Sequence, residues 1–172
     1  MSKKEHHNRP DLIGEHSFGD AGQLISFIVF TIIYILDVFI LKISTFPNEI
    51  VPLYVRIPLA VIVFVVSAYL VVKSISIIFG EKREKPEVVR KEIYGRIRHP
   101  MYVSEILLYF GLLCLNISLI TVGVWILIIV FLYAICRYEE KILIEYFGND
   151  YIAYMKEVPM WIPRLRKKKN NA

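Results

Sequence analysis

Four long apolar blocks restrict the fold of this chain more than any other feature of its sequence. They cover residues 24–41, 57–79, 101–115 and 119–136. Only Asp37, Lys73 and Glu105 bring a charge into them. A bilayer core takes about 20 helical residues, and fewer where a helix is short or paired with a neighbour. The blocks therefore predict an all-α integral membrane bundle of about four transmembrane helices.

The last two blocks are expected to form a helical hairpin. Only Asn116, Ile117 and Ser118 separate them, which leaves room for nothing longer than a tight turn. The helices of a soluble protein normally keep a polar stripe, whereas the central turns of these blocks have none. The chain is also 56% hydrophobic, above the level of about 45–50% that is typical of soluble domains. These observations disfavour a soluble helical protein.

The distribution of basic residues predicts how the bundle sits in the membrane. Residues 73–98 contain eight Lys or Arg, and the stretch from Arg137 onward contains eight more. The loop between the first two blocks offers only Lys42 and Arg56. Because cytoplasmic loops carry an excess of basic residues, both basic regions and both termini are expected in the cytoplasm. The net charge of +5 then indicates attraction to anionic headgroups rather than nucleic-acid binding, for which no recognition module is visible.

A cation-rich segment precedes the third block and reads Ile-Tyr-Gly-Arg-Ile-Arg-His-Pro-Met-Tyr over residues 93–102. Pro100 suits the first turn of a helix, and His99 then falls at the cap position. The N–H groups of such a helix start, beside Arg96 and Arg98, form a seat for a carboxylate or phosphate. Anchoring of these side chains among lipid headgroups is the alternative interpretation.

Two adjacent carboxylates, Glu139 and Glu140, follow directly after the fourth block. If the helix ends there, they oppose its dipole and need a cation nearby. A solvated helix end neutralised by Arg137 and Lys141 is one interpretation. The other is a ligand that carries a carboxylate, an ammonium and a sulfonium, which would satisfy this pair and the arginine–histidine–proline segment together. S-adenosylmethionine has this set of charges.

The order of these motifs resembles that of a known family. The segment 93–102 is followed by an apolar hairpin, then by Glu-Glu-Lys-Ile-Leu over residues 139–143 and Phe-Gly-Asn-Asp-Tyr-Ile-Ala-Tyr over residues 147–154. Val-Pro-Met-Trp-Ile-Pro at 158–163 is similar to the family's terminal element. Over residues 88–163 the chain resembles the isoprenylcysteine carboxyl methyltransferase and phospholipid methyltransferase superfamily of integral membrane enzymes.

The resemblance implies an enzyme that binds S-adenosylmethionine in a cytoplasm-facing pocket, closed by a C-terminal helical segment. It also implies a lipid or prenylated substrate that enters from the bilayer between the helices. The residues that the resemblance assigns to the cofactor pocket are Tyr94, Arg98, His99, Pro100, Tyr102, Glu139 and Glu140.

The expected organisation is a single membrane methyltransferase domain over residues 1–172. A polar N-terminal segment at 1–20 precedes two membrane helices at 21–79, the cofactor-binding core lies at 88–163, and a basic tail occupies 164–172. The sequence has no cluster of Cys and His residues with metal-ligand spacing, so no metal is expected.

The methyl acceptor stays open between a carboxylate and an amine. Many carboxyl methyltransferases of the superfamily place an arginine where this chain has Ile135, and the nearest arginine, Arg137, lies about half a helical turn away. An amine must lose a proton before it attacks, so its methylation needs a base. Glu105, three residues after Tyr102, and His99 are the candidate bases. The expected catalytic residues are therefore Glu105, Arg137 and His99, and the acceptor is a prenylated cysteine-like carboxylate or an amine phospholipid.

Two other functions are kept as alternatives. Membrane sterol and steroid reductases, which use NADPH, share an Arg-His-Pro-x-Tyr-like element, but they generally need more than four helices. A lipid-binding relative without catalytic activity is the third function considered. Asp37, inside the first block, is either a functional residue or a partner of Arg56 or Lys42 near the outer face.

Overall fold

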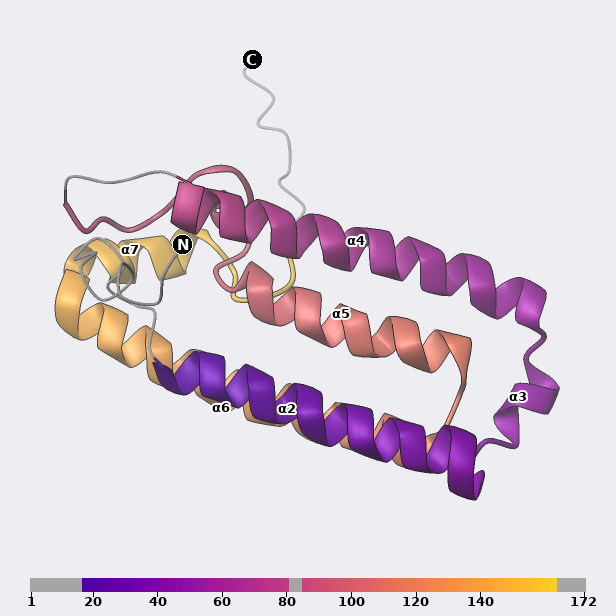
Figure 1. The fold of residues 1–172 in the computed structure, drawn as a ribbon. Helices are drawn as coiled ribbons and strands as arrows, with labels where there is room; N and C mark the ends of the chain where they lie inside the picture. Colours follow the sequence, from indigo (N-terminus) through magenta and orange to yellow (C-terminus); the bar gives the residue numbers. More distant parts are fainter. Residues whose placement is uncertain (1–16, 81–84, 164–172) are drawn as a thin grey trace, which may run out of the picture.

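The computed structural model describes residues 17–80 and 85–163, and these residues form helices joined by short connections (Figure 1). No strand occurs within the two ranges, so the expectation of an all-α bundle is confirmed. The expected basic tail at 164–172 lies outside the described residues. The helices in chain order are α2 (Ser17–Ile35), the π-helix η1 (Leu36–Leu41), α3 (Pro47–Ile50), α4 (Leu53–Gly80), the 3-10 helix η2 (Glu92–Gly95), α5 (Pro100–Leu115), α6 (Leu119–Phe147) and α7 (Asn149–Glu157).

The long helices run side by side, with α5 packed against α4 and α2 packed against α6 (Figure 1). Residues 85–102 and 137–163 lie together at one end of the bundle, which we call the polar end. Residues 36–56 and 112–121 lie at the opposite end, which we call the turn end because it contains the tight connection between α5 and α6. The expected hairpin of the last two helices is therefore confirmed.

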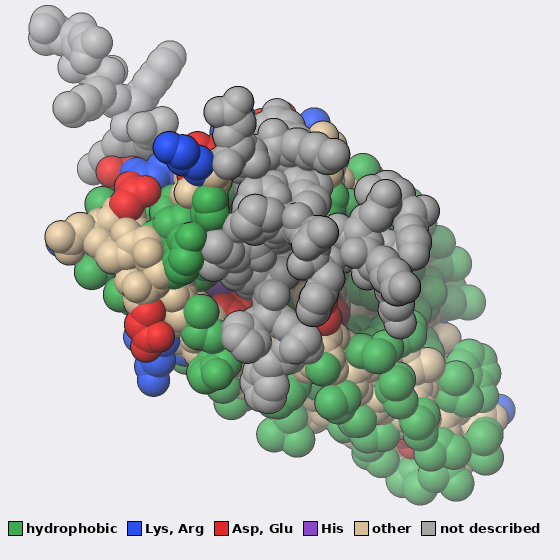
Figure 2. Space-filling model, turned by 60° about the vertical axis from the view of Figure 1, so that its left-hand side comes forward, with side chains coloured by type: hydrophobic (Ala, Val, Ile, Leu, Met, Phe, Trp, Pro, Cys, Tyr) green, Lys and Arg blue, Asp and Glu red, His purple; other side chains and the backbone are tan. Residues whose placement is uncertain are grey.

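Three helices are long and apolar enough to cross a membrane, namely Gly19–Leu41, Leu53–Gly80 and Leu119–Phe147. The fourth apolar helix, α5, has 16 residues. That length is about 24 Å, short of a hydrocarbon core of about 30 Å. Large apolar side chains face outward, as Val65 and Leu127 do with 63% and 69% exposure. In Figure 2, hydrophobic side chains cover most of the visible described surface, and charged side chains gather toward one end.

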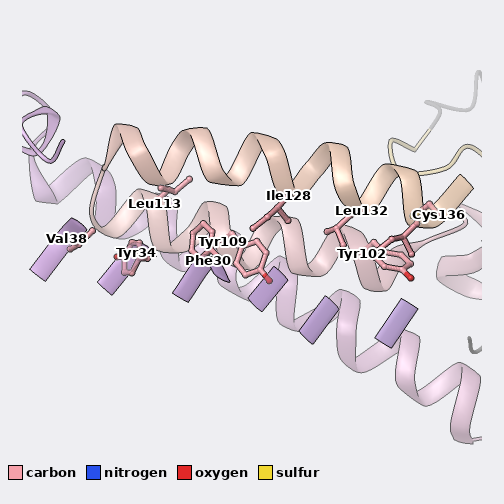
Figure 3. Packing of buried hydrophobic residues seen from close by; sticks show 10 residues of the cluster. Phe30, Tyr34, Val38, Tyr102, Tyr109, Leu113, Ile128, Leu132 and Cys136 are labelled. Atoms are coloured by element: carbon pink, nitrogen blue, oxygen red, sulfur yellow. The ribbon is translucent and has the colours of Figure 1, made fainter. Parts of the chain in front are cut away.

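The buried core lies where α2, α5 and α6 meet (Figure 3). Phe30 and Tyr109 are completely buried, and their rings stack with centroids 4.3 Å apart. Gly22 lets α2 approach α6 closely, because a Cβ atom there would lie 2.4 Å from Cδ1 of Ile135. These contacts fix α5 between its neighbours and so set the position of the motif at its start.

The structure corrects the expected end of the fourth membrane helix. α6 continues without a break through Glu139 and Glu140 to Phe147. Its last turns carry Leu143 and Ile144, which pack against the buried Tyr151 of α7 and its neighbours. The two glutamates therefore lie inside a helix, and the argument from an unfavourable dipole at a helix end does not apply to them.

A network of buried polar groups holds the turn end together. Asp37 accepts hydrogen bonds from the hydroxyls of Ser44 and Ser118, each 2.5 Å away, and from the backbone N–H groups of residues 43 and 44. Pairing of Asp37 with Arg56 or Lys42, one of the two alternatives that the sequence left open, is not formed in the described chain. Arg56 instead donates to the side-chain oxygen of Asn48 and, at 2.9 Å, to the carbonyl of Leu115. Asp37 thus joins the end of α2 to the start of α6.

Candidate active site

The segment before α5 is held in place by the C-terminal residues of the described chain. The backbone N–H of Arg98 lies 3.0 Å from the carbonyl oxygen of Pro159, and that of His99 lies 3.2 Å from the carbonyl oxygen of Met160. The hydroxyl of Tyr154 donates to the carbonyl of Tyr94 at 2.6 Å. Three separate backbone positions of the arginine–histidine–proline segment are therefore fixed by residues more than fifty positions away in the sequence.

Arg98 connects this segment to α6 and to α7. Its Nη2 atom lies 2.6 Å from Oε1 of Glu140, and its Nε atom donates to the same oxygen at 2.8 Å. Its Nη1 atom donates to the carbonyls of Met155 and Val158 at 2.9 and 2.7 Å. Both charged side chains are buried, with 8% and 1% exposure. The structure thus brings together the two motifs that the sequence predicted to share one site.

Glu140 finds its cations within the protein. In addition to Arg98, Arg137 donates to Oε2 of Glu140 at 3.0 Å, and Nε2 of His99 lies 3.4 Å from Oε1. A buried carboxylate normally needs such partners, because an uncompensated charge in a low dielectric is costly. The sequence predicted that the acidic pair needs a cation, and for Glu140 that cation is supplied by arginine side chains of the same chain.

Glu139 faces a different set of neighbours. Its Oε1 atom accepts a hydrogen bond from the hydroxyl of Tyr102, and its Oε2 atom lies 3.7 Å from Nδ1 of His99. The first turn of α2 comes close to this pair. A Cβ atom on Gly19 would lie 2.2 Å from Oε1 of Glu139 and 2.6 Å from the Tyr102 hydroxyl oxygen. Glycine at this position therefore permits the close approach.

The remaining predicted pocket residues lie in the same neighbourhood. Pro100 is the first residue of α5 and is buried, and His99 is its N-cap residue. Tyr94 is buried in η2. Ile135 is buried in the core with 2% exposure. The side chain of Arg137, two residues further along α6, is 50% exposed. The predicted cofactor residues are thus close together, and Arg137 lies at their edge.

Burial also affects the tyrosines of α7 that close off this end. It raises the pKa of Tyr151 and of Tyr154 above the ordinary tyrosine value, so both hydroxyls stay protonated at neutral pH. Tyr154 can therefore serve as a constant hydrogen-bond donor to Tyr94. The two rings contact each other edge to face, with centroids 5.6 Å apart. They form a neutral layer next to the charged cluster.

Glu105 is the candidate base besides His99, and it lies about one helical turn after Tyr102 in α5. Its Oε1 atom accepts a hydrogen bond from the hydroxyl of Tyr109, while its Oε2 atom is buried and has no hydrogen-bond partner among the described residues. Glu105 lines a cavity of about 650 Å³ between α2, α4 and α5. The sequence did not predict this cavity, because its lining residues come from three helices and form no motif.

Among the described residues, no group of three His, Cys, Asp or Glu side chains is arranged to hold a metal ion. The comparisons with known proteins agree with the motif pattern. Residues 55–150 match the family model described as phospholipid methyltransferase. The match covers more than half of the chain and includes α4, α5, α6 and the charged cluster between them. A search of curated proteins found no match.

Proposed function

Because the chain belongs to the phospholipid methyltransferase family, and is thus a membrane methyltransferase that acts on lipid, we propose that S-adenosylmethionine binds at its polar end and donates the methyl group. The observation that carries the proposal is the convergence of the arginine–histidine–proline segment with the acidic pair. Arg98 and Glu140 lie 2.6 Å apart although 42 positions separate them in the sequence.

The chemistry of the cluster suits such a donor. Glu139 provides a carboxylate for a cationic group, and the ring of Tyr102 beside it can contribute a cation–π contact of about 0.5–2 kcal/mol with the sulfonium. His99 contacts both glutamates and is placed to contact the bound molecule as well. Tyr94 and Pro100 add apolar lining. These are the groups that we assign to the cofactor.

Arg98 and Glu140 have a supporting part in this proposal. All the guanidinium nitrogens of Arg98 already have partners, in Glu140 and in the carbonyls of Met155 and Val158. Their ion pair keeps the segment before α5, α6 and the C-terminal residues in one arrangement. Methyl transfer is an in-line displacement, so most of the catalysis comes from such alignment of the reacting groups.

The cavity favours an amine as the methyl acceptor. A carboxylate acceptor would be repelled by the carboxylate of Glu105, whereas an ammonium would be attracted to it and could pass it a proton. The position at which many carboxyl methyltransferases carry an arginine is Ile135 here, and Arg137 already binds Glu140. N-methylation of an amine phospholipid is therefore our first choice, and carboxyl methylation of a prenylated cysteine-like substrate is the second.

The membrane orientation proposed with this function places the polar end, the active site and both termini in the cytoplasm. It rests on the excess of basic residues in the sequence at 73–98 and from Arg137 onward. The described parts of the chain at 85–98 and 137–163 belong to the polar end. Labelling of single cysteines at exposed positions, such as Glu92 at the polar end and Glu49 at the turn end, tests it in intact cells. Labelling of the cysteine at position 92 by a reagent outside the cell would show that the protein has the opposite orientation.

Two measurements on the purified protein test the proposed reaction. We expect S-adenosylhomocysteine to raise the thermal unfolding temperature, and NADPH to leave it unchanged. We also expect radioactive methyl transfer from S-adenosylmethionine to a lipid fraction, with alkali-stable label for an N-methyl product and alkali-labile label for an ester. Stabilisation by NADPH alone would favour a reductase, and binding of the donor without transfer to any lipid would favour a noncatalytic relative.

A further inference from the structure

The cavity beside Glu105 lies about one helical turn along α5 from Tyr102 and is lined by residues of α2, α4 and α5. Gln23 and Phe27 of α2 form one wall, Ser67 and Ala68 of α4 form the other, and Ser104 and Glu105 of α5 form the floor. Its volume of about 650 Å³ falls within the range of about 300–1,000 Å³ that is usual for small-molecule sites.

Apolar side chains that line the cavity are also exposed on the outside of the bundle, where a membrane-spanning helix would meet the hydrocarbon of the bilayer. Leu24 and Phe27, which both line the cavity, are 59% and 45% exposed on a membrane-spanning helix. Ala68 is an exposed residue of the opposite wall. Apolar side chains on both sides of an opening at this depth permit the lateral entry of an acyl chain, because hydrocarbon there contacts only hydrocarbon.

The cavity and the proposed cofactor site lie on neighbouring turns of α5. The hydroxyl of Ser67 donates to the carbonyl of Ser104 at 2.7 Å, which fixes α4 against α5. Met101 lines the cavity and directly precedes Tyr102, whose hydroxyl contacts Glu139. From Tyr102 to Glu105 the helix rises by only about 4.5 Å. A molecule beside Glu105 is therefore about one helical turn along α5 from Tyr102.

Glu105 is the one charged side chain among the described residues that line the cavity. Its Oε1 atom accepts a hydrogen bond from Tyr109. Its Oε2 atom is buried and makes no direct hydrogen bond within the described chain, while the side chain of Gln23 interacts with this carboxyl group. A carboxylate at membrane depth is costly unless a cation or a donor meets it. A lipid with a cationic headgroup complements both parts of this cavity, its apolar walls and its single negative charge.

We propose that the cavity between α2, α4 and α5 is the docking site of the lipid substrate, which enters sideways from the bilayer and presents its amine to Glu105. The proposal rests on the proposed function and adds to it the place where the lipid acceptor docks, beside the base already named there. Small side chains at Ser67, Ala68 and Ser104 keep the cavity open for the lipid.

The proton and the electrons of the step can be followed. The carboxylate of Glu105 takes one proton from the ammonium of the headgroup. The lone pair that is freed on nitrogen forms the new bond to the methyl carbon while the carbon–sulfur bond breaks, and the bonding pair stays on sulfur as a neutral thioether. The product is a methylated ammonium. Glu105 returns its proton to water, so one proton is released per methyl group transferred.

A filling substitution tests the docking site. Ala68→Phe places a ring in the opening, and we expect lipid methylation to fall at least tenfold while stabilisation by S-adenosylhomocysteine is unchanged. Ala134→Phe, on an exposed part of α6 away from the cavity, is the matched control and is expected to keep both properties. Normal lipid turnover by Ala68→Phe would overturn the proposal. If the unmodified protein does not bind S-adenosylhomocysteine, the result would instead contradict the proposed function.

The pH dependence of Glu105→Gln tests the role of the carboxylate. Without a base, only lipid that is already deprotonated can react, so the rate of the variant should rise about tenfold per pH unit below the pKa of the amine. The unmodified enzyme should show a shallower rise over the same interval, and binding of S-adenosylhomocysteine should be equal in both. A variant with unchanged rate and pH profile, or an unmodified enzyme that forms only alkali-labile esters, would refute the assignment of Glu105.

Discussion

The two ends of the bundle each contain a buried carboxylate, but the donors around the two carboxylates differ. At the turn end, Asp37 is 2% exposed and is bonded by two serine hydroxyls and two backbone N–H groups. At the polar end, Glu140 is 1% exposed and is bonded by Arg98 and Arg137. Neutral donors stabilise one charge, and formal cations stabilise the other.

The difference separates a structural role from a functional one. The donors around Asp37 lie within the connections that they fix, and the network is complete without any other molecule. At the polar end, two arginines contact Glu140, and the adjacent Glu139 contacts Tyr102 and His99. A cluster with several charges of both signs is costly to bury. Such a cluster is more readily explained by ligand binding than by stability alone, since apolar packing would stabilise a fold as well.

The largest expected effect concerns the ion pair itself. Glu140→Ala leaves the buried guanidinium of Arg98 without its partner and should lower the free energy of unfolding by about 3–5 kcal/mol. Thermal unfolding in detergent or in lipid discs measures this loss. Glu145→Ala, an exposed position on the same helix, is the control and should change stability little. If the two variants unfold alike, Glu140 does not hold the polar end together.

At the opposite end, Asp37→Asn should cost about 1–3 kcal/mol, because an amide cannot accept all the hydrogen bonds that the carboxylate accepts. The same unfolding measurement applies. The folded variant should bind S-adenosylmethionine with unchanged affinity, since Asp37 is at the turn end. A selective loss of cofactor affinity at constant stability would contradict the structural role that we assign to this residue.

A substitution at Glu139 should lower the affinity for the cofactor and leave stability nearly unchanged, the reverse of the result expected for Asp37→Asn. Glu139→Gln keeps the size of the side chain and removes its charge, so the affinity for S-adenosylmethionine should fall about tenfold, which corresponds to about 1.4 kcal/mol. Isothermal titration measures the affinity, and the unfolding temperature without ligand should change little. Unchanged affinity in this variant would remove Glu139 from the proposed cofactor site.

The smallest effect is expected at Arg137, whose side chain is 50% exposed. Ion pairs in contact with solvent contribute about 0.2–1 kcal/mol and are weakened by salt. Arg137→Gln should therefore reduce stability within that range at low ionic strength, and by less at high ionic strength. A loss as large as that of Glu140→Ala would show that Arg137, rather than Arg98, is the main partner of the buried carboxylate.

Much of this arrangement could be predicted from sequence, because it depends on local rules. The apolar blocks, the three-residue turn before Ser118 and the helix start at Pro100 follow from hydropathy and backbone chemistry. The proximity of Arg98 and Glu140 could also be predicted, because the distribution of basic residues assigned both motifs to the same membrane face. The turn brings them to the same end of a hairpin.

Other features depend on contacts that no local rule describes. Asp37 and Ser118 are far apart in the sequence, and only the packing of α2 on α6 brings them together. The continuation of α6 past Glu140 depends on α7 covering its last turns. The cavity at Glu105 is lined by residues such as Gln23 and Ala68, which come from different helices and belong to no sequence motif.

The short helix α5 sets the depth of the two proposed substrate sites relative to the end of α4. Val71 and Met101 line the same cavity, and α4 then continues to Gly80, about 14 Å beyond the first turn of α5. If the proposed reaction takes place there, the reacting centre would lie below the surface of the leaflet. The proposed hydrophilic methyl donor would then have to enter the leaflet, whereas the proposed lipid acceptor would stay within its layer. Turnover should consequently decline in reconstituted bilayers as their thickness increases.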